Sequence, residues 1–237
     1  MTDPTRRIGV LASGGGSTFE AVQDAIETEE ITGIEIAVVV CNNGPENPDA
    51  RVWERASRLG IDIVQISNKT ERTCTLPEIN GEPVKGAISF EASKKMMSLA
   101  DDRGLSMYVG LGFMKKIIGE VLQGIPIANE HPGPLGPDKL TAGKWGTGVQ
   151  EEVMLQGLEY SGPTMHWMDK RLDEHGMPAY DTGQEIGHEP VKVTNAMRQE
   201  WEQNGTVDLL KYEVMRVEKL WVPSWIVKAA EQINVSA

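Results

Sequence analysis

The residue types best suited to chemistry occur together as Asn129-Glu130-His131-Pro132, directly after the apolar run 125–128. An apolar run of this length, stopped by proline and glycine, predicts a short buried strand. Side chains alternate along a strand, so Asn129 and His131 are predicted to point the same way at its carboxyl end. An amide there can stabilise a developing oxyanion, and an imidazole can accept or donate a proton near neutral pH. The alternative is a histidine with only a surface or structural role.

A second candidate site follows the first predicted strand, residues 7–12. Residues 13–18 read Ser-Gly-Gly-Gly-Ser-Thr, and a helical pattern begins at once with Phe19, Val22 and Ile26. Glycines let the backbone approach a ligand, and the free N–H groups at a helix start attract anions. The segment is neither a Walker loop nor a complete dinucleotide-binding loop, because the Gly-Lys-Ser/Thr ending and the third glycine are missing. The alternative is a tight turn in which Ser17 or Thr18 caps the helix.

Both candidates need a scaffold, and the hydrophobic pattern predicts an α/β fold. Strands are predicted at 7–12, 34–41 and 61–66, with helices at 19–26 and 50–59 between them. This β-α-β-α-β order is typical of a doubly wound, mostly parallel sheet with helices on both faces, as in Rossmann-like folds. Further elements are predicted in order: helix 90–100, strand 106–110, helices 115–122 and 148–155, strands 162–168 and 191–193, and a last helix 212–226 broken at Pro223.

Composition excludes several classes of protein. The 237 residues carry a formal net charge of −12 and a pI of about 4.9, which argues against a nucleic-acid binder. No apolar stretch approaches the roughly 20 residues that span a bilayer. The two cysteines, Cys41 and Cys74, have no partners at metal-binding spacing, and no signal-peptide pattern precedes the first strand. We therefore expect a cytoplasmic protein that binds neither a membrane nor a metal. Residues 68–86 are polar and contain two prolines and an Asn-Gly turn, so they are expected to form an inserted hairpin or excursion, and no linker divides the chain.

Five segments, taken in order, resemble the folate-dependent formyltransferases. They are residues 10–17, Gly112-Phe113-Met114, Asn129-x-His131-Pro132, residues 180–183, and Val217-Glu218 with Pro223. The segments together span roughly residues 7–227. They are most similar to the branch of the family that formylates glycinamide ribonucleotide in purine biosynthesis. Each segment alone is a weak signal, whereas the ordered set is specific.

The resemblance implies a single domain, residues 1–237, with a phosphate-binding half at about 7–105 and a catalytic and folate-binding half at about 106–230. It implies that a formyl group passes from 10-formyltetrahydrofolate, as co-substrate, to the amine of glycinamide ribonucleotide, with no metal. The implied catalytic residues are Asn129, His131 and Asp181. The implied phosphate and ribonucleotide site is Gly15, Gly16, Ser17, Thr18, Gly112 and Glu218. The implied folate site is Phe113, Met114, Lys115, Lys116, Ile117 and Asp181.

The sequence also departs from the family pattern. Gly133 stands where a serine is common, Lys219 stands where a histidine usually follows the glutamate, and the segment before Asp181 is about five residues longer by our alignment. That segment contains Asp173, a rival for the catalytic carboxylate; Asp181 is preferred because Thr182-Gly183 follows it. These departures bear on the acceptor more than on the reaction.

Several rival functions remain open at this stage. One is formylation of another amine, such as a sugar nucleotide. Another is hydrolysis of 10-formyltetrahydrofolate. Such hydrolases usually carry an extra N-terminal domain, and the seven residues before the first predicted strand are expected to leave no room for one. A nucleotide-binding oxidoreductase is disfavoured because Asn42 and Asn43, rather than an acidic residue, follow the second strand. A catalytically silent binding module is disfavoured by the intact Asn129, His131 and Asp181. We expect small-molecule partners and either a monomer or a homodimer.

Overall fold

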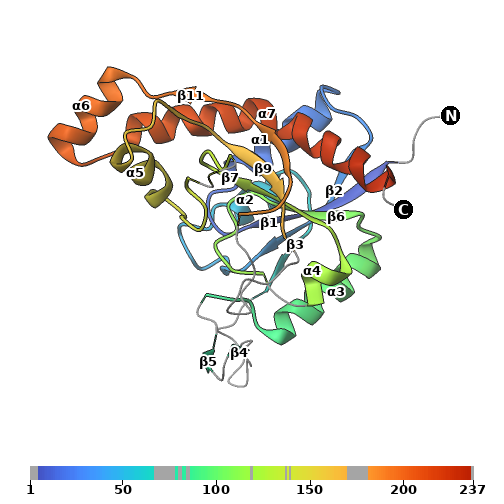
Figure 1. Ribbon diagram of the computed structural model, residues 1–237. Coiled ribbons are helices and arrows are strands. Elements are labelled where there is room, and N and C mark those ends of the chain that lie inside the picture. Colours follow the sequence, from blue (N-terminus) through green and yellow to red (C-terminus); the bar gives the residue numbers. More distant parts are fainter. Residues whose placement is uncertain are drawn as a thin grey trace.

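The computed structural model describes residues 5–66, 78–79, 82–83, 86–117, 120–136, 138, 140–169 and 181–235. Within them, seven strands form one sheet in the order β10-β9-β7-β6-β1-β2-β3 (Figure 1). Five are parallel: β1 (Arg6–Ala12), β2 (Ile34–Cys41), β3 (Ile63–Gln65), β6 (Met107–Gly110) and β7 (Ile127–His131). Two more strands extend the sheet beyond β7: β9 (Thr164–Trp167) runs antiparallel to β7, and β10 (Glu185–His188) runs antiparallel to β9. The predicted doubly wound, mostly parallel sheet is confirmed.

Helices cover both faces of the sheet because its central strands are apolar on both sides. One face packs on α1 (Ser17–Glu27), α2 (Val52–Arg58) and the second half of α7 (Asp208–Val235). The other face packs on α3 (Phe90–Arg103) and α4 (Glu120–Gly124). A smaller apolar cluster joins α5 (Gly148–Leu155), α6 (Asn195–Asn204) and the first half of α7 with β11 (Val191–Lys192), which pairs with β8 (Tyr160–Ser161). Figure 1 shows α7 lying across one face of the sheet and extending beyond it toward α5 and α6.

The strand order places a binding site at one edge of the sheet. From β1 the chain adds β2 and β3 on one side, and it then crosses to add β6 and β7 on the other. The direction in which strands are added to the sheet therefore reverses between the neighbouring strands β1 and β6. Open α/β sheets bind ligands at the carboxyl ends of the strands at such a point. The loop 13–16 leaves β1 at this point, and the turn 111–114 leaves β6 beside it, joined by the bond from Ser13 N to Gly112 O (3.1 Å).

Two helix predictions differ from the structure, and one helix was not predicted. The predicted helix 115–122 differs at its start, because Lys116 forms a parallel bridge with Ala87, and α4 spans Glu120–Gly124. The predicted break at Pro223 is wrong, since α7 runs through it from Asp208 to Val235. Burial of apolar side chains on both sides of the proline, such as Val222 and Ile226 (each 0% exposed), outweighs the one backbone hydrogen bond that proline removes. Helix α6 was not predicted.

Part of the predicted insertion 68–86 falls within the described residues. Strands β4 (Glu78–Ile79) and β5 (Glu82–Pro83) pair antiparallel, which confirms a hairpin there. Cys74, Asp173 and Tyr180 lie outside the described residues. Cys41 is buried and its thiol is free.

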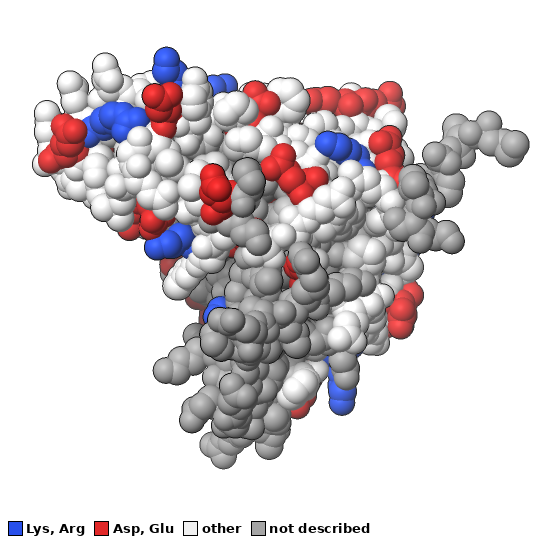
Figure 2. Space-filling model, viewed as in Figure 1, with Lys and Arg blue, Asp and Glu red and all other residues white. Residues whose placement is uncertain are grey.

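Charged side chains are dispersed over the face seen in Figure 2. Lys and Arg lie among Asp and Glu there, without gathering over one element in the described part of that face. Among the helices that the structure describes, none has the length and apolar character needed to cross a bilayer.

Candidate active site

The carboxyl end of β7 presents Asn129 and His131 on one face of the sheet, as the strand alternation predicted. The neighbouring strand β9 adds a third polar side chain, because its register pairs His166 with Asn129. Asn129 Nδ2 lies 3.5 Å from His166 Nε2. His131 and His166 are 3% and 1% exposed, so this polar group is held within the protein rather than on its surface.

Asp181 lies between the two histidines. Its Oδ2 is 3.7 Å from His131 Nδ1, and its Oδ1 is 3.4 Å from His166 Nε2. The amide of Gly143 donates a 2.9 Å hydrogen bond to Oδ2, which ties this carboxylate to the loop that follows β7. The structure therefore brings together the three residues predicted for catalysis, with Asp181 at His131. The rival carboxylate, Asp173, lies outside the described residues.

Backbone geometry holds Asp181 in this place. Its φ of 53° is in the left-handed region, which aspartate tolerates better than most residues. Two residues later, Gly183 passes so close to the chain at Trp167 that a methyl group there would overlap the Trp167 carbonyl oxygen. The glycine that led us to prefer Asp181 is thus required by the close approach of two backbone segments.

Thr141 fixes the orientation of the His131 ring. Its Oγ1 lies 2.9 Å from His131 Nε2 and 2.9 Å from the carbonyl oxygen of Pro134. A carbonyl oxygen only accepts, so the hydroxyl donates to Pro134 and accepts from Nε2–H of His131. In the neutral ring the unprotonated nitrogen is then Nδ1, which faces Asp181. Gly133 leaves the room for this arrangement, since a Cβ there would press on the Thr141 side chain.

The pKa values of the pair follow from burial and mutual attraction. Burial lowers the pKa of His131 below its ordinary value, with nearby His166 acting in the same direction and Asp181 opposing both. Burial alone would raise the pKa of Asp181. The hydrogen bond with His166, the proximity of His131 and the Gly143 amide outweigh it and hold the pKa of Asp181 below its ordinary value. At neutral pH this site therefore contains a carboxylate beside a neutral His131 imidazole.

A hollow of about 420 Å³ lies at the start of α1. It is lined by residues predicted for the phosphate, Gly15, Gly16, Ser17, Thr18 and Gly112, together with Gly14, Leu111 and Met215. Three cationic residues that were not predicted also line it, namely Arg51, Arg55 and Lys219. Arg55 bonds to the Gly15 carbonyl and forms a 2.7 Å ion pair with Glu20. Cations and glycine backbone at a helix start are the features that bind a phosphate.

The helix start itself is left available for an anion. Helix α1 is preceded by Gly16, at φ 70°, and has no side-chain cap. The alternative in which Ser17 or Thr18 caps this helix is therefore wrong. Thr18 instead donates a 3.3 Å hydrogen bond to Glu218 Oε2 on α7, which places the predicted substrate glutamate at the edge of the hollow.

The turn after β6 supplies the predicted folate segment. Ser13 Oγ accepts a 2.7 Å hydrogen bond from Met114 N, so this segment is fixed to the phosphate loop. Phe113 packs against the core, whereas Met114 is 48% exposed and its methyl group lies next to Gly146. An exposed methionine on a rigid turn suits the face of a flat ring. Ile117 is 2% exposed and is a core residue, so its side chain supports this segment from behind.

Sequence reasoning missed several residues of the site. His166 was not among the predicted site residues, yet it contacts both Asp181 and Asn129. Its strand position was predicted, but the pairing of β9 with β7 was not. Thr141 lies 10 positions after His131 in the loop that follows β7, and no sequence motif marks it. The cations of the hollow lie far along the chain from the glycine loop that they meet, and they carry no local signal. Among the described residues, no group of three or more His, Cys, Asp or Glu side chains is arranged to hold a metal ion.

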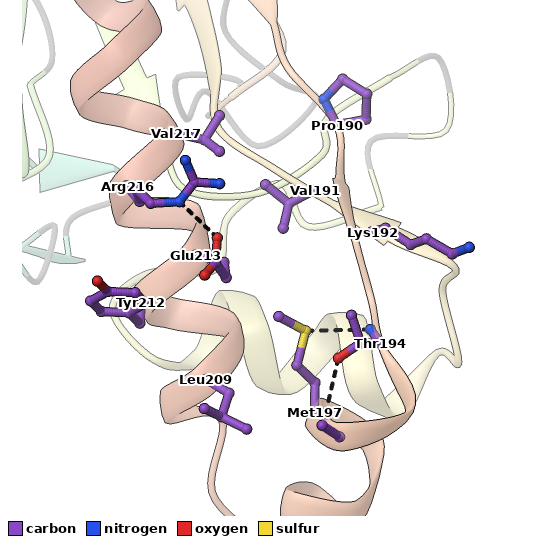
Figure 3. A pocket seen from close by; sticks show the side chains of 11 residues that line it. Pro190, Val191, Lys192, Thr194, Met197, Leu209, Tyr212, Glu213, Arg216 and Val217 are labelled. Carbon is purple, nitrogen blue, oxygen red and sulfur yellow. Dashed lines mark hydrogen bonds and ion pairs between the residues drawn. The ribbon is translucent and has the colours of Figure 1, made fainter.

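A second hollow, of about 440 Å³, lies between α6, β11 and the first half of α7 (Figure 3). Thr194, Met197, Tyr212 and Arg216 are among its lining residues. The hydrogen bonds drawn there between Thr194 and Met197 belong to the start of α6. None of the residues predicted for the site lines this hollow.

Comparison with known proteins identifies the family. The family model described as formyl transferase matches residues 6–206. The chain belongs to the formyl transferase family. Phosphoribosylglycinamide formyltransferase of Bacillus subtilis is 24% identical over 226 residues, which are 93% of each chain. The chloroplastic phosphoribosylglycinamide formyltransferase of Arabidopsis thaliana is 26% identical over 190 residues, 79% of this chain and 56% of that protein.

The chain thus spans about half the length of the plant relatives that it matches. Among solved structures, glycinamide ribonucleotide transformylase 1 from Symbiobacterium toebii has a TM-score of 0.73 at 23% identity, covering 98% of this chain and 90% of that one. This likeness establishes the formyltransferase fold for the family member described here.

Proposed function

We propose that this protein transfers the formyl group of 10-formyltetrahydrofolate to the amine of glycinamide ribonucleotide, a step of purine biosynthesis. The observation that carries the proposal is the meeting of Asn129, His131 and Asp181 at the end of β7, beside a cation-lined phosphate hollow. Relatives named for this reaction support it.

The proposed mechanism is direct transfer. The amine nitrogen forms a bond to the formyl carbon, whose oxygen becomes negative, and the Asn129 amide donates a hydrogen bond to that oxygen. Neutral His131 takes the proton that the attacking nitrogen must lose. A proton on His131 Nδ1 faces Asp181, which stabilises the resulting imidazolium. When the bond from the formyl carbon to the folate nitrogen breaks, that nitrogen receives the proton, so no net charge is left on the protein.

Two further sets of residues position the substrates, one for the acceptor and one for the folate. Gly15, Gly16, Ser17 and Thr18 offer backbone N–H groups to the phosphate of the acceptor, and Glu218 accepts hydrogen bonds from its ribose or amide groups. Phe113 and Met114, with Lys115 and Lys116, form the wall for the pterin ring of the folate.

We propose that residues 1–237 act as one formyltransferase domain with an insertion at 68–86. Its phosphate-binding half is at about 7–105, and its catalytic and folate-binding half is at about 106–230. It would work on small molecules in the cytoplasm, as a monomer or a homodimer.

The decisive experiment is incubation with 10-formyltetrahydrofolate and a panel of amines, while release of the deformylated folate is measured. We expect release that depends on glycinamide ribonucleotide and exceeds that with an amino sugar nucleotide or with glycinamide lacking phosphate. Release without any amine would identify a hydrolase. The proposal would be refuted if none of the amines increased the release of deformylated folate.

The phosphate hollow has a matched pair of variants. Lys219→Ala removes a cation that lines the hollow, whereas Lys211→Ala removes an exposed lysine of the same helix outside it. Loss of one charge-assisted contact is expected to raise KM for the ribonucleotide about tenfold, with little change in kcat. Equal KM values for the two variants would remove Lys219 from the phosphate site.

A further inference from the structure

Two buried carboxyl groups meet between β7 and α7. Glu130 lies between Asn129 and His131, so the strand alternation turns it to the opposite face, toward α7. Glu218 reaches the same place from α7, and the two side chains hydrogen-bond to each other. Glu130 is 8% exposed and Glu218 is 6% exposed. No role was assigned to Glu130 from the sequence.

The surroundings of this pair hold little positive charge. Thr18 of α1 donates to Glu218 Oε2, and Lys219 of α7 attracts the Glu218 carboxylate. Asp181 adds a negative charge that acts on Glu130. Across the ladder from Glu130 stands the apolar Met165 of β9. Within the described part of the chain, no Lys or Arg pairs with Glu130, and its Oε1 has no hydrogen-bond partner.

Such a pair cannot carry two full charges near neutral pH. Buried like charges repel, and without a cation each also loses its hydration, so one proton is retained. Burial raises the pKa of Glu130 well above its ordinary value, and the neighbouring Glu218 adds to this. Burial raises the pKa of Glu218 to about 7, although the hydrogen bond from Glu130 acts in the other direction. Glu130 is therefore the donor of the pair and Glu218 the acceptor.

We propose that Glu130 is a positioning residue, which keeps one proton and donates it to Glu218 so that Glu218 meets the acceptor as a single oriented carboxylate. This inference rests on the proposed function, in which Glu218 contacts the acceptor. The hydrogen bonds then form a continuous path from the phosphate hollow through Thr18, Glu218 and Glu130 to β7, the strand of His131. The acceptor would thereby be aligned with the catalytic strand through its own recognition group.

Two variants separate the role of the hydrogen bond from that of side-chain volume. Glu130→Gln keeps a donor to Glu218, whereas Glu130→Leu removes the donor and replaces it with an apolar side chain of similar volume. Loss of the donor raises the pKa of Glu218, because the hydrogen bond from Glu130 lowers it. With Glu130→Leu we therefore expect the acid limb of kcat/KM for glycinamide ribonucleotide to move upward by about one pH unit. At pH values below that acid limb, the KM for the acceptor would rise about tenfold, and the KM for the formyl donor would not change.

The control is Met165→Leu, which alters packing directly beside Glu130 without touching a proton. Its acid limb is expected at the wild-type pH, as is that of Glu130→Gln. Thermal unfolding of each variant checks that it folds. An unmoved limb in Glu130→Leu, or a limb moved equally in both Glu130 variants, would overturn the proposal.

A measurement without substrates keeps this inference distinct from the proposed function. Infrared difference spectra at about pH 8 should contain the carbonyl stretch of one protonated buried carboxyl, and this band should be missing in Glu130→Gln. Absence of the band in the wild type overturns the shared proton, whatever the turnover. Presence of the band together with failure of every amine acceptor would refute the proposed function and the acceptor contact, while the proton-sharing pair would stand.

Discussion

Replacement of Asp181 by asparagine tests the central interaction of the site. The change keeps the size of the side chain and removes the negative charge 3.7 Å from His131 Nδ1, at side-chain exposures of only 4% and 15% for the two residues. Opposite charges at this distance attract by about 4 kcal/mol at an effective dielectric constant of about 20. The amide dipole and water recover part of that energy. A remaining loss of about 3 kcal/mol corresponds to a turnover at least about a hundredfold lower.

The assay is release of deformylated folate at saturating acceptor and donor, over a range of pH. Because Asp181 raises the pKa of His131, its removal should also move the acid limb of kcat that belongs to His131 to lower pH. The matched control is Asp62→Asn, which removes the carboxylate of a surface ion pair with Arg103 (2.8 Å) and should leave kcat unchanged. Asp181→Asn and His131→Ala should each cost about a hundredfold and be non-additive together, since the two residues act as a unit.

One result would refute this reasoning directly. Near wild-type kcat in Asp181→Asn, combined with a large loss in Asp173→Asn, would transfer the catalytic role to Asp173. Additive losses in the double variant would instead show that Asp181 acts elsewhere than through His131.

Three further predictions follow from single contacts. Thr141→Val leaves Nε2–H of His131 without an acceptor and should cost about 1–3 kcal/mol of stability, seen as a Tm several degrees lower, whereas Thr141→Ser should not. Gly183→Ala forces a methyl group against the Trp167 carbonyl and should lower kcat more than tenfold with the circular dichroism spectrum unchanged. The pKa of Glu218 is raised on folding from 4.5 to about 7, so its contribution to stability is present below about pH 4.5 and is lost as pH rises to about 7. Chemical denaturation should therefore find Glu218→Gln gaining about 1–3 kcal/mol relative to wild type between about pH 4.5 and pH 8, and an equal difference at both pH values would contradict this.

Much of the fold could be read from local patterns. Apolar runs such as 34–41 coincide with β2, and the helix predicted at 148–155 coincides with α5. Strands buried on both faces give continuous apolar runs, and glycines mark where the chain turns, so these signals need no tertiary information. Helix α7 was mispredicted at Pro223 because its stability comes from packing on the sheet, which local propensity does not report.

The sequence by itself determined the β-α-β-α-β order of the first 66 residues, and it placed Asn129 and His131 together at the end of a strand. These follow from short-range periodicity and from side-chain chemistry, whereas the aspartate was indicated only by the resemblance to the formyltransferases. Only the tertiary structure decided which groups meet: Asp181 between His131 and His166, the cations around the glycine loop, and Glu130 against Glu218. Strand pairing and helix packing join residues up to 200 positions apart, as for Thr18 and Glu218, and such contacts leave no trace in any local window of sequence.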